Sequence, residues 1–194
     1  MSQQGSLFDF EPPPKNTDRL FFAVLPDGAA IARIRALTAE LKAQHGMTGR
    51  PIADAKLHAT LCVLGDFPGL PDTLIARASQ AAMLVASSTQ PFKVRFDKAQ
   101  TFVNRARNRP YVLTGTEGVA GIVDLYRSLA MTLLKVGIAG NPSSYTPHVT
   151  LLYDDVTAAP QFVSPVEWTV REFALLRSHI GQSLPYEVLA RWSF

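Results

Sequence analysis

The sequence LHATLCVLG (57–65) decides the fold together with a second stretch, HVTLLY (148–153). Both contain the phrase His-x-Thr-Leu, and both are apolar runs of strand length. In a strand, residues i and i+2 point to the same face, so the histidine and threonine of each phrase are predicted to project together. The residue between them is expected to point into the core. The repeat therefore predicts two strands that each present an imidazole beside a hydroxyl.

This pairing of groups suits phosphate chemistry. The imidazoles of His58 and His148 have an ordinary pKa of about 6.5, so they can take or release a proton near neutral pH. The hydroxyls of Thr60 and Thr150 can donate hydrogen bonds to phosphate oxygens. If the two strands face each other across a groove, one imidazole can take a proton from attacking water while the other protonates the departing oxygen. The residues alone leave open which histidine has which role.

Chance must be weighed against this interpretation. One His-x-Thr phrase in an apolar strand is most often a hydrogen-bonded, partly buried histidine with no chemical role. The chain has only four histidines, however, and two of them stand in this phrase. Two copies in strand-like runs favour a functional interpretation.

The segments around the repeat predict an α+β fold in which strands dominate. Periodicity and turn residues predict strands at 20–26, 57–65, 91–96, 110–115, 148–153, 167–178 and 186–194, and helices at 28–45, 72–87 and 119–136. The clearest strand is PFKVRF (91–96), in which apolar and basic residues alternate strictly. The last two strands are expected to pair antiparallel.

Composition places the chain among ordinary globular proteins. It has 194 residues, of which 47% are hydrophobic and 18% charged, so it is neither disordered nor a coiled coil. The net charge of +3 suits an anionic ligand but is too small for a protein that coats nucleic acid by charge alone. Cys62 is the single cysteine, which excludes an internal disulfide. It follows Thr60 by two residues, so we expect a small buried thiol at the floor of the groove, not a nucleophile.

The first residues predict a flexible tail, 1–18, ahead of one folded body, 19–194. Pro12, Pro13 and Pro14 favour an extended segment, and neither an export signal nor an apolar run long enough to span a bilayer is visible. A cytoplasmic protein is expected. Within the tail, Gln4 to Phe8 resembles the short motif by which bacterial proteins bind the replication sliding clamp. A plain disordered tail is the alternative.

The sequence that flanks the repeat resembles that of the two-histidine phosphoesterase superfamily. Within it, the chain is most similar to the bacterial RNA 2′,3′-cyclic phosphodiesterases, also called 2′-5′ RNA ligases. RLFFAVLP (19–26) resembles the opening strand of that family, LHATLCVLG (57–65) its first motif and TPHVTLLY (146–153) its second. The resemblance covers about residues 19–194. It implies two pseudo-symmetric lobes with mainly antiparallel sheets, a V-shaped cleft between them and helices on the outside.

The resemblance also implies an activity. It indicates hydrolysis of a 2′,3′-cyclic phosphate on RNA to a 2′-phosphomonoester, without a metal or other cofactor. His58 would be the proton donor and His148 the proton acceptor, and Thr60 and Thr150 would bind the phosphate. The partner would be an RNA with a cyclic end, for which tRNA fragments are one candidate, and a monomer is expected. Because the chemistry is reversible, weak 2′-5′ joining of RNA is also expected.

One departure from the family leaves the choice of substrate open. Many members carry an arginine shortly after the second motif, where this chain has Leu152 and Tyr153. Three other arginines, Arg105, Arg107 and Arg109, would lie on one side of an extended segment and could contact RNA; a solvated turn is the alternative. Tyr153 and Phe22 could stack on a base, or belong to the core or its rim.

Two other functions compete with this one. The first is a phosphodiesterase for small nucleotides, such as ADP-ribose cyclic phosphate or 2′-5′ oligonucleotides. The second is an RNA-end binding module without catalysis, although a pure binder has no need of two groups that transfer protons.

Overall fold

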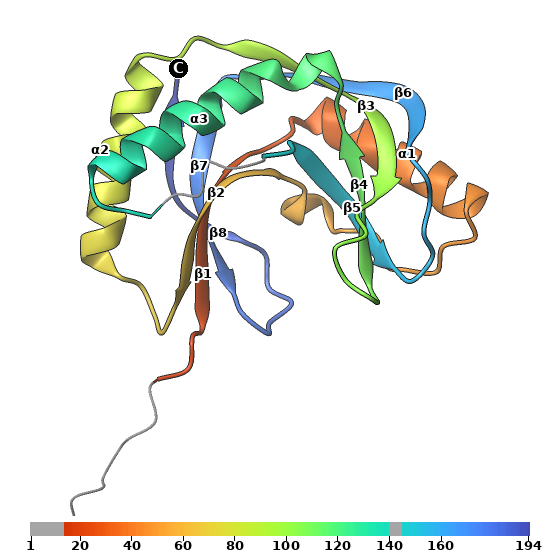
Figure 1. The fold of residues 1–194 in the computed structure, drawn as a ribbon, viewed down its shortest axis with the longest axis horizontal. Coiled ribbons are helices and arrows are strands. Elements are labelled where there is room, and N and C mark those ends of the chain that lie inside the picture. Colours follow the sequence, from red (N-terminus) through yellow and green to blue (C-terminus); the bar gives the residue numbers. More distant parts are fainter. Residues whose placement is uncertain (1–13, 140–144) are drawn as a thin grey trace, which may run out of the picture.

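The computed structural model describes residues 14–139 and 145–194 (Figure 1). The segment Gln4–Phe8 with its predicted clamp-binding motif lies outside these residues. The strands are β1 (Asp18–Val24), β2 (Ala59–Phe67), β3 (Phe92–Thr101), β4 (Arg109–Thr114), β5 (His148–Asp154), β6 (Gln161–Val170), β7 (Glu172–His179) and β8 (Glu187–Ser193). The α-helices are α1 (Gly28–Gln44), α2 (Asp72–Ser87) and α3 (Ala120–Lys135), and single 3-10 turns cover Asp54–Lys56 and Glu117–Val119.

The strands form one antiparallel sheet in the order β6-β3-β4-β5-β2-β1-β7-β8. Its centre is a narrow seam, because β2 and β5 pair through a single register position, Ala59 opposite Val149. The sheet therefore consists of a terminal half (β2, β1, β7 and β8) and a middle half (β5, β4, β3 and β6). The two halves diverge from the seam (Figure 1). The α+β fold with two antiparallel halves agrees with the prediction.

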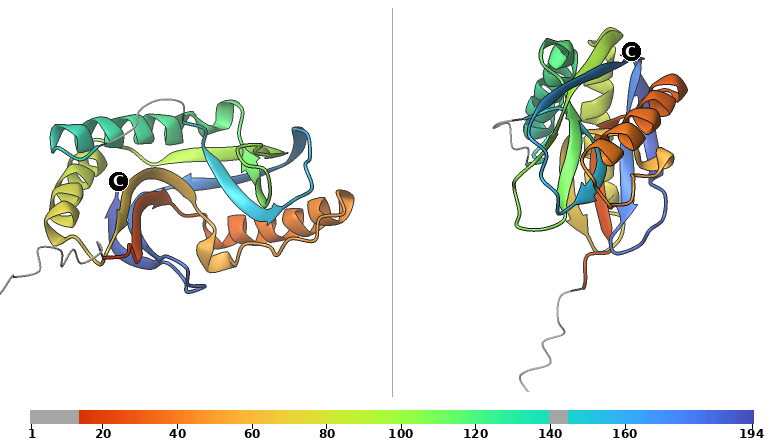
Figure 2. Two further views of the ribbon diagram at one scale, coloured as in Figure 1. Left: turned by 60° about the horizontal axis from the view of Figure 1, so that its bottom comes forward. Right: turned by 90° about the vertical axis from the view of Figure 1, so that its right-hand side faces the viewer.

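The two halves repeat one arrangement. Each places its motif strand innermost, next to the strand that precedes it across a helix: β1-α1-β2 in the terminal half and β4-α3-β5 in the middle half. Helix α1 packs on β5 and β6, α2 packs on α3 and β8, and α3 contacts both β2 and β3. The helices thus lie outside the sheet and tie the halves together (Figure 2). In the described part of the chain, no helix has the length and apolar character needed to cross a membrane.

One hydrophobic core runs through both halves. Its fully buried side chains include Phe22 and Phe173 from the terminal half and Phe96 and Tyr111 from the middle half. A smaller cluster lies on the other face of the terminal half, formed by Phe21, Ala23, Ala174 and Leu176. Successive residues of β1 therefore serve different faces, and this alternation decides which of its aromatic rings reaches the seam.

The strand expected at 167–178 is in fact two strands. β6 ends at Val170 and β7 begins at Glu172, with Arg171 between them. β6 is the outer strand of the middle half, whereas β7 pairs with β1 in the terminal half. The chain crosses between the halves at this point. Only Arg171 separates the two strands, and strand-forming residues continue on both sides of it, so the sequence alone does not reveal the break.

Candidate active site

The two His-x-Thr phrases meet at the seam of the sheet. Ala59 and Val149, the middle residues of the phrases, are the paired residues, and both are fully buried. In an antiparallel pair the residue before one partner lies opposite the residue after the other. The register therefore brings His58 opposite Thr150 and Thr60 opposite His148. All four side chains point to the face away from the buried alanine and valine.

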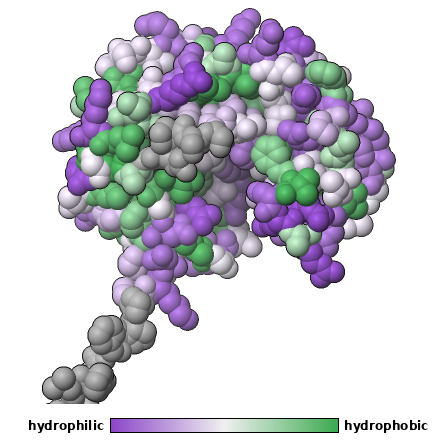
Figure 3. All heavy atoms as spheres, viewed as in Figure 1, coloured by the Kyte–Doolittle hydropathy of each residue, from purple (hydrophilic) through white to green (hydrophobic). Residues whose placement is uncertain are grey.

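These four side chains line one pocket of about 400 Å³, here called the cleft. Figure 3 shows the molecule hollowed between its two halves. The cleft is lined by Arg19, Phe21, Ile52, Lys56, His58, Thr60, Val63, His148, Thr150, Tyr153, Ser178 and Tyr186. Residues from the start, middle and end of the chain thus converge on the pair of imidazoles.

A second pocket, of about 510 Å³, lies between α1 and residues 46–57. Its walls are mostly apolar, with side chains such as Ile34, Met47 and Leu57, and it contains no histidine. Because the repeated motif opens into the cleft, we place the candidate active site there.

Both imidazoles are held in the same way. Nδ1 of His58 lies 2.7 Å from the backbone carbonyl oxygen of Lys56, and Nδ1 of His148 lies 2.8 Å from that of Thr146. A carbonyl oxygen can only accept, so each Nδ1 carries the hydrogen. In the neutral form, Nε2 of each ring is then the nitrogen with the free lone pair. Both histidines are therefore oriented to exchange a proton through Nε2.

Aromatic rings surround the imidazoles. Phe21 and Tyr186 lie on His58, each with a ring-centroid distance of 5.2 Å. Phe102 lies edge-on to His148 at 5.1 Å. These rings restrict the movement of the imidazoles and lower the local polarity. Burial, together with the nearby positive charge of a protonated His148, holds the pKa of His58 below its ordinary value, although its bond to Lys56 opposes this.

Positive side chains edge the cleft on the His58 side. Arg19 forms a two-point ion pair with Asp66, at 2.7 and 2.8 Å, and Lys56 places its ammonium 5.5 Å from the ring centre of Tyr186. No group of three potential metal-ligating side chains occurs within the described ranges. Asp66 balances the charge of Arg19, so it is the ammonium of Lys56 that suits an anionic ligand.

Phe22 was predicted as a residue that could stack on RNA, and the structure contradicts this. Its side chain is fully buried and packs on Phe173 and Trp192, 5.9 and 5.7 Å away between ring centroids. Its neighbour Phe21 faces the cleft instead. The run LFFAVLP is apolar throughout, so it gives no indication of which alternate residues face the core. Tyr153, in contrast, lines the cleft as predicted.

Cys62 lies in the core and not at the floor of the cleft. The reason is an irregularity in the pairing of β1 with β2. Phe21 pairs with Val63 and Ala23 with Thr60, so β2 contains one extra residue between these positions. Such a bulge shifts the alternation of side chains, and Val63 takes the cleft position expected for Cys62. Burial raises the pKa of the thiol to about 12.

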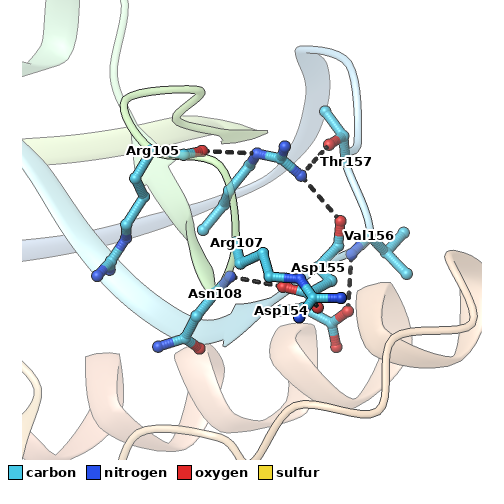
Figure 4. Close-up of polar contacts among 8 residues, drawn as sticks. Arg105, Arg107, Asn108, Asp154, Asp155, Val156 and Thr157 are labelled. Atoms are coloured by element: carbon cyan, nitrogen blue, oxygen red, sulfur yellow. Dashed lines mark hydrogen bonds and ion pairs between the residues drawn. The ribbon is translucent and has the colours of Figure 1, made fainter.

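The three arginines of the 104–109 loop diverge instead of sharing one side (Figure 4). Arg107 points to Asp155, 3.9 Å away, and Arg109 donates to the backbone oxygens of Arg105 and Asp155, both at 3.0 Å. Asn108 has a positive φ of 51°, so the segment turns and is not extended. Arg105 alone reaches the edge of the cleft, where its guanidinium lies 5.0 Å from the ring centre of Tyr153.

Several cleft residues were not predicted from the sequence. Lys56 precedes His58 by two residues, and its backbone oxygen anchors the ring, so its proximity to the motif was a usable signal. Phe21 and Arg19 belong to β1, and its apolar sequence does not indicate which of its residues face the cleft and which face the core. Tyr186 comes from the end of the chain, and nothing in its local sequence indicates contact with His58.

Comparison with known proteins places this geometry in context. The profile of the family described as the 2′-5′ RNA ligase superfamily matches residues 25–182. The RNA 2′,3′-cyclic phosphodiesterase of Escherichia coli (strain K12) is 30% identical over 183 residues, which are 90% of this chain and 96% of that protein.

Solved structures agree in fold. A protein of Thermus thermophilus superposes with a TM-score of 0.72 at 26% identity, over 90% of this chain and 97% of that one. Escherichia coli LigT in complex with 3′-AMP superposes with a TM-score of 0.64 at 28% identity, over 92% and 98%.

Proposed function

Since the chain belongs to the 2′-5′ RNA ligase superfamily, we propose that it hydrolyses the 2′,3′-cyclic phosphate at an RNA end to a 2′-phosphomonoester without a metal, and joins RNA through 2′-5′ linkages as a side reaction. One observation carries the proposal: the register of Ala59 with Val149 brings two imidazole–hydroxyl pairs into one cleft. The family supports a cyclic phosphodiesterase or ligase activity, and the geometry supports how this chain would perform it.

In this mechanism each motif residue has one task. Nε2 of His148 takes a proton from the attacking water, and Nε2 of His58 gives a proton to the departing 3′ oxygen of the ribose. The hydroxyls of Thr60 and Thr150 donate to the two non-bridging phosphate oxygens. The water–phosphorus bond forms as the bond from phosphorus to the 3′ oxygen breaks. A positioned acid or base contributes roughly 10²- to 10⁴-fold to such a step.

The low pKa of His58 has a consequence for its proposed role as acid. In the empty cleft, burial disfavours the protonated ring. A bound phosphate anion favours it, because an opposite charge within hydrogen-bonding distance raises the pKa of an imidazole. We therefore propose that His58 gains its proton together with the substrate.

The rest of the cleft is proposed to hold the terminal nucleotide. Phe21 and Tyr186 offer aromatic surfaces for the base or ribose beside His58, and Lys56 adds positive charge. The Escherichia coli neighbour was solved in complex with 3′-AMP, which supports a nucleotide as a ligand of this fold.

A direct test incubates the protein with an RNA oligomer that ends in a 2′,3′-cyclic phosphate and identifies the phosphomonoester. We expect the 2′ isomer, no effect of chelator, and a kcat/KM lower by at least about 100-fold for His58→Ala and for His148→Ala. Arg127→Ala, on the exposed face of α3, is the control and should behave like the wild type. The 3′ isomer, loss of activity in chelator, or a histidine variant with most of its activity would contradict the mechanism.

The same assay separates the competing functions. A cyclic mononucleotide turned over far faster than the oligomer would favour a small-nucleotide phosphodiesterase. Binding of the oligomer without turnover would favour a non-catalytic module.

A further inference from the structure

A side pocket of about 470 Å³ adjoins the cleft at His148. It is lined by Phe102, Asn104, Arg105, Pro110, Tyr145, Thr146, His148, Thr150 and Tyr153. Three of these residues, His148, Thr150 and Tyr153, also line the cleft, so the two spaces lie side by side. Residues beside His58, such as Phe21 and Tyr186, line the cleft but not the side pocket. The side pocket therefore extends the site on the His148 side only.

The side pocket lies on the side of the phosphate from which the attacking group enters. In an in-line displacement, the attacking oxygen enters opposite the departing oxygen. Under the proposed function, the departing 3′ oxygen belongs to the terminal ribose and faces His58, so the attacking group enters past His148. A water molecule occupies only about 30 Å³. The side pocket is much larger than hydrolysis requires on the entry side.

The walls of the side pocket have the chemistry of a nucleotide site. Phe102 and the partly exposed ring of Tyr153 offer aromatic surface on which a base can stack. Arg105 supplies a guanidinium, which binds phosphate through paired hydrogen bonds. A volume of 470 Å³ lies in the range of sites that hold molecules of nucleoside size.

The loop that carries Arg105 is held while its guanidinium is left available. Arg109 binds the backbone oxygen of Arg105 and ties it to Asp155 and Thr157, and Asn108 donates its N–H to Asp155 at 2.6 Å. In Figure 4 the guanidinium of Arg105 points away from this network. Within residues 14–139 and 145–194 it has no carboxylate at ion-pair distance, whereas Arg107 is paired with Asp155.

We infer that the side pocket binds the nucleotide whose 5′-hydroxyl attacks the cyclic phosphate in the joining reaction, and that Arg105 holds the phosphate of this acceptor. The inference rests on the proposed function and assigns it a second substrate site. The 5′ oxygen bonds to phosphorus and loses its proton to His148, and the bond from phosphorus to the 3′ oxygen breaks as His58 protonates that oxygen. The products are a 2′-5′ phosphodiester and a free 3′-hydroxyl, and no other reactant is consumed.

The test measures joined and hydrolysed product in one reaction, with a labelled cyclic-end RNA and increasing amounts of a 5′-hydroxyl oligonucleotide. The joined fraction of the wild type should rise with acceptor and saturate. Arg105→Ala should lower the ratio of joined to hydrolysed product about tenfold at low acceptor concentration. Arg107→Ala, a variant of the same loop whose side chain points to Asp155, should leave the ratio unchanged.

A modified acceptor probes the contact itself. Replacing its first phosphodiester by a neutral methylphosphonate should lower joining by the wild type, with no further loss in Arg105→Ala. Absence of hydrolysis by the wild type would defeat the proposed function. Hydrolysis without joining at millimolar acceptor, equal loss of both products in Arg105→Ala, or a methylphosphonate effect that persists in that variant would overturn the acceptor site while leaving the hydrolase intact.

Discussion

The hydroxyl of Tyr145 donates a hydrogen bond to the backbone carbonyl oxygen of Thr60, with 2.7 Å between the two oxygens. This bond connects the segment before the second motif to the strand of the first. The neighbour of Tyr145, Thr146, accepts the hydrogen of His148 Nδ1, so the bond fixes one imidazole relative to the opposite motif. Burial raises the pKa of Tyr145, so its hydroxyl stays protonated and able to donate throughout the physiological range.

Tyr145→Phe should therefore lower activity more than its effect on stability suggests. Loss of one hydrogen bond costs about 1 kcal/mol of stability. Misalignment of the two motifs should in addition raise the activation free energy by a similar amount, which would reduce kcat/KM by about three- to tenfold. Tyr111→Phe is the matched control, because Tyr111 is buried and its hydroxyl accepts from Gln161, outside the cleft. Urea denaturation and steady-state kinetics of both variants check this. Equal kcat/KM in the two variants would leave Tyr145 a purely stabilising residue.

The pH dependence of the rate should reveal whether His58 acts as the acid or as the base. If His58 is the acid, kcat/KM falls as the pH rises through the pKa of His58 in the free protein, and this pKa lies below its ordinary value of 6.5. The corresponding limb of kcat should lie at higher pH, because the bound phosphate raises that pKa. Rates measured across the acidic and mildly alkaline range give both profiles. If His58 were the base, kcat/KM would instead rise with pH through that low pKa.

The alternation of side chains within each motif could be predicted from the sequence, because an apolar residue on either side of a polar one indicates a half-buried strand. That the two motifs lie together in one site could be expected only because they resemble each other and the motifs of a known family. Their register depends on one pair, Ala59 with Val149, and nothing local to either strand specifies it.

Where prediction failed, the local sequence was uniform or a distant contact decided the outcome. Phe21 and Phe22 are identical neighbours in an apolar run, so their faces could not be assigned. The bulge in β2 that moves Val63 into the cleft depends on pairing with β1. The arginines of the 104–109 loop diverge because Asp155, which is distant in the chain, binds the loop.

Cys62 should be inert in the folded protein. With its pKa raised to about 12 from 9.0, the thiol has about 1,000-fold less thiolate than an exposed cysteine at pH 8. Iodoacetamide at pH 8 should leave the native protein unlabelled and label it once urea is added, as mass spectrometry can show. Cys62→Ala should keep kcat/KM within about threefold, because the thiol does not line the cleft. Rapid labelling of the native protein, or a loss of activity as large as that of the histidine variants, would contradict this placement.

Asp154 should make the protein sensitive to acid. Its carboxylate lies at the end of β5 and accepts the backbone N–H groups of Thr48 and Gly49, at 2.8 and 2.6 Å, and that of Val156 at 2.8 Å. These bonds, that of Val156 first, hold the pKa of Asp154 below its ordinary value of 3.8. Its stabilising contribution is thus fully present above that value and is lost as the pH falls through the lower pKa of the folded protein.

Asp154→Asn should lower the free energy of unfolding at pH 7 by about 1–3 kcal/mol, since an amide cannot accept at both positions and leaves an N–H donor without a partner. The loss should be smaller at pH 3 than at pH 7, because below 3.8 the carboxyl group binds a proton in the unfolded wild type while the bonds of the folded protein resist its protonation. Urea denaturation at both pH values tests this, with Asp124→Asn on the surface of α3 as the control. Because the bound loop leads directly to His58, kcat/KM of Asp154→Asn should also fall a few-fold at pH 7. A destabilisation that is the same at pH 7 and pH 3 would mean that the charge of Asp154 does not hold this loop.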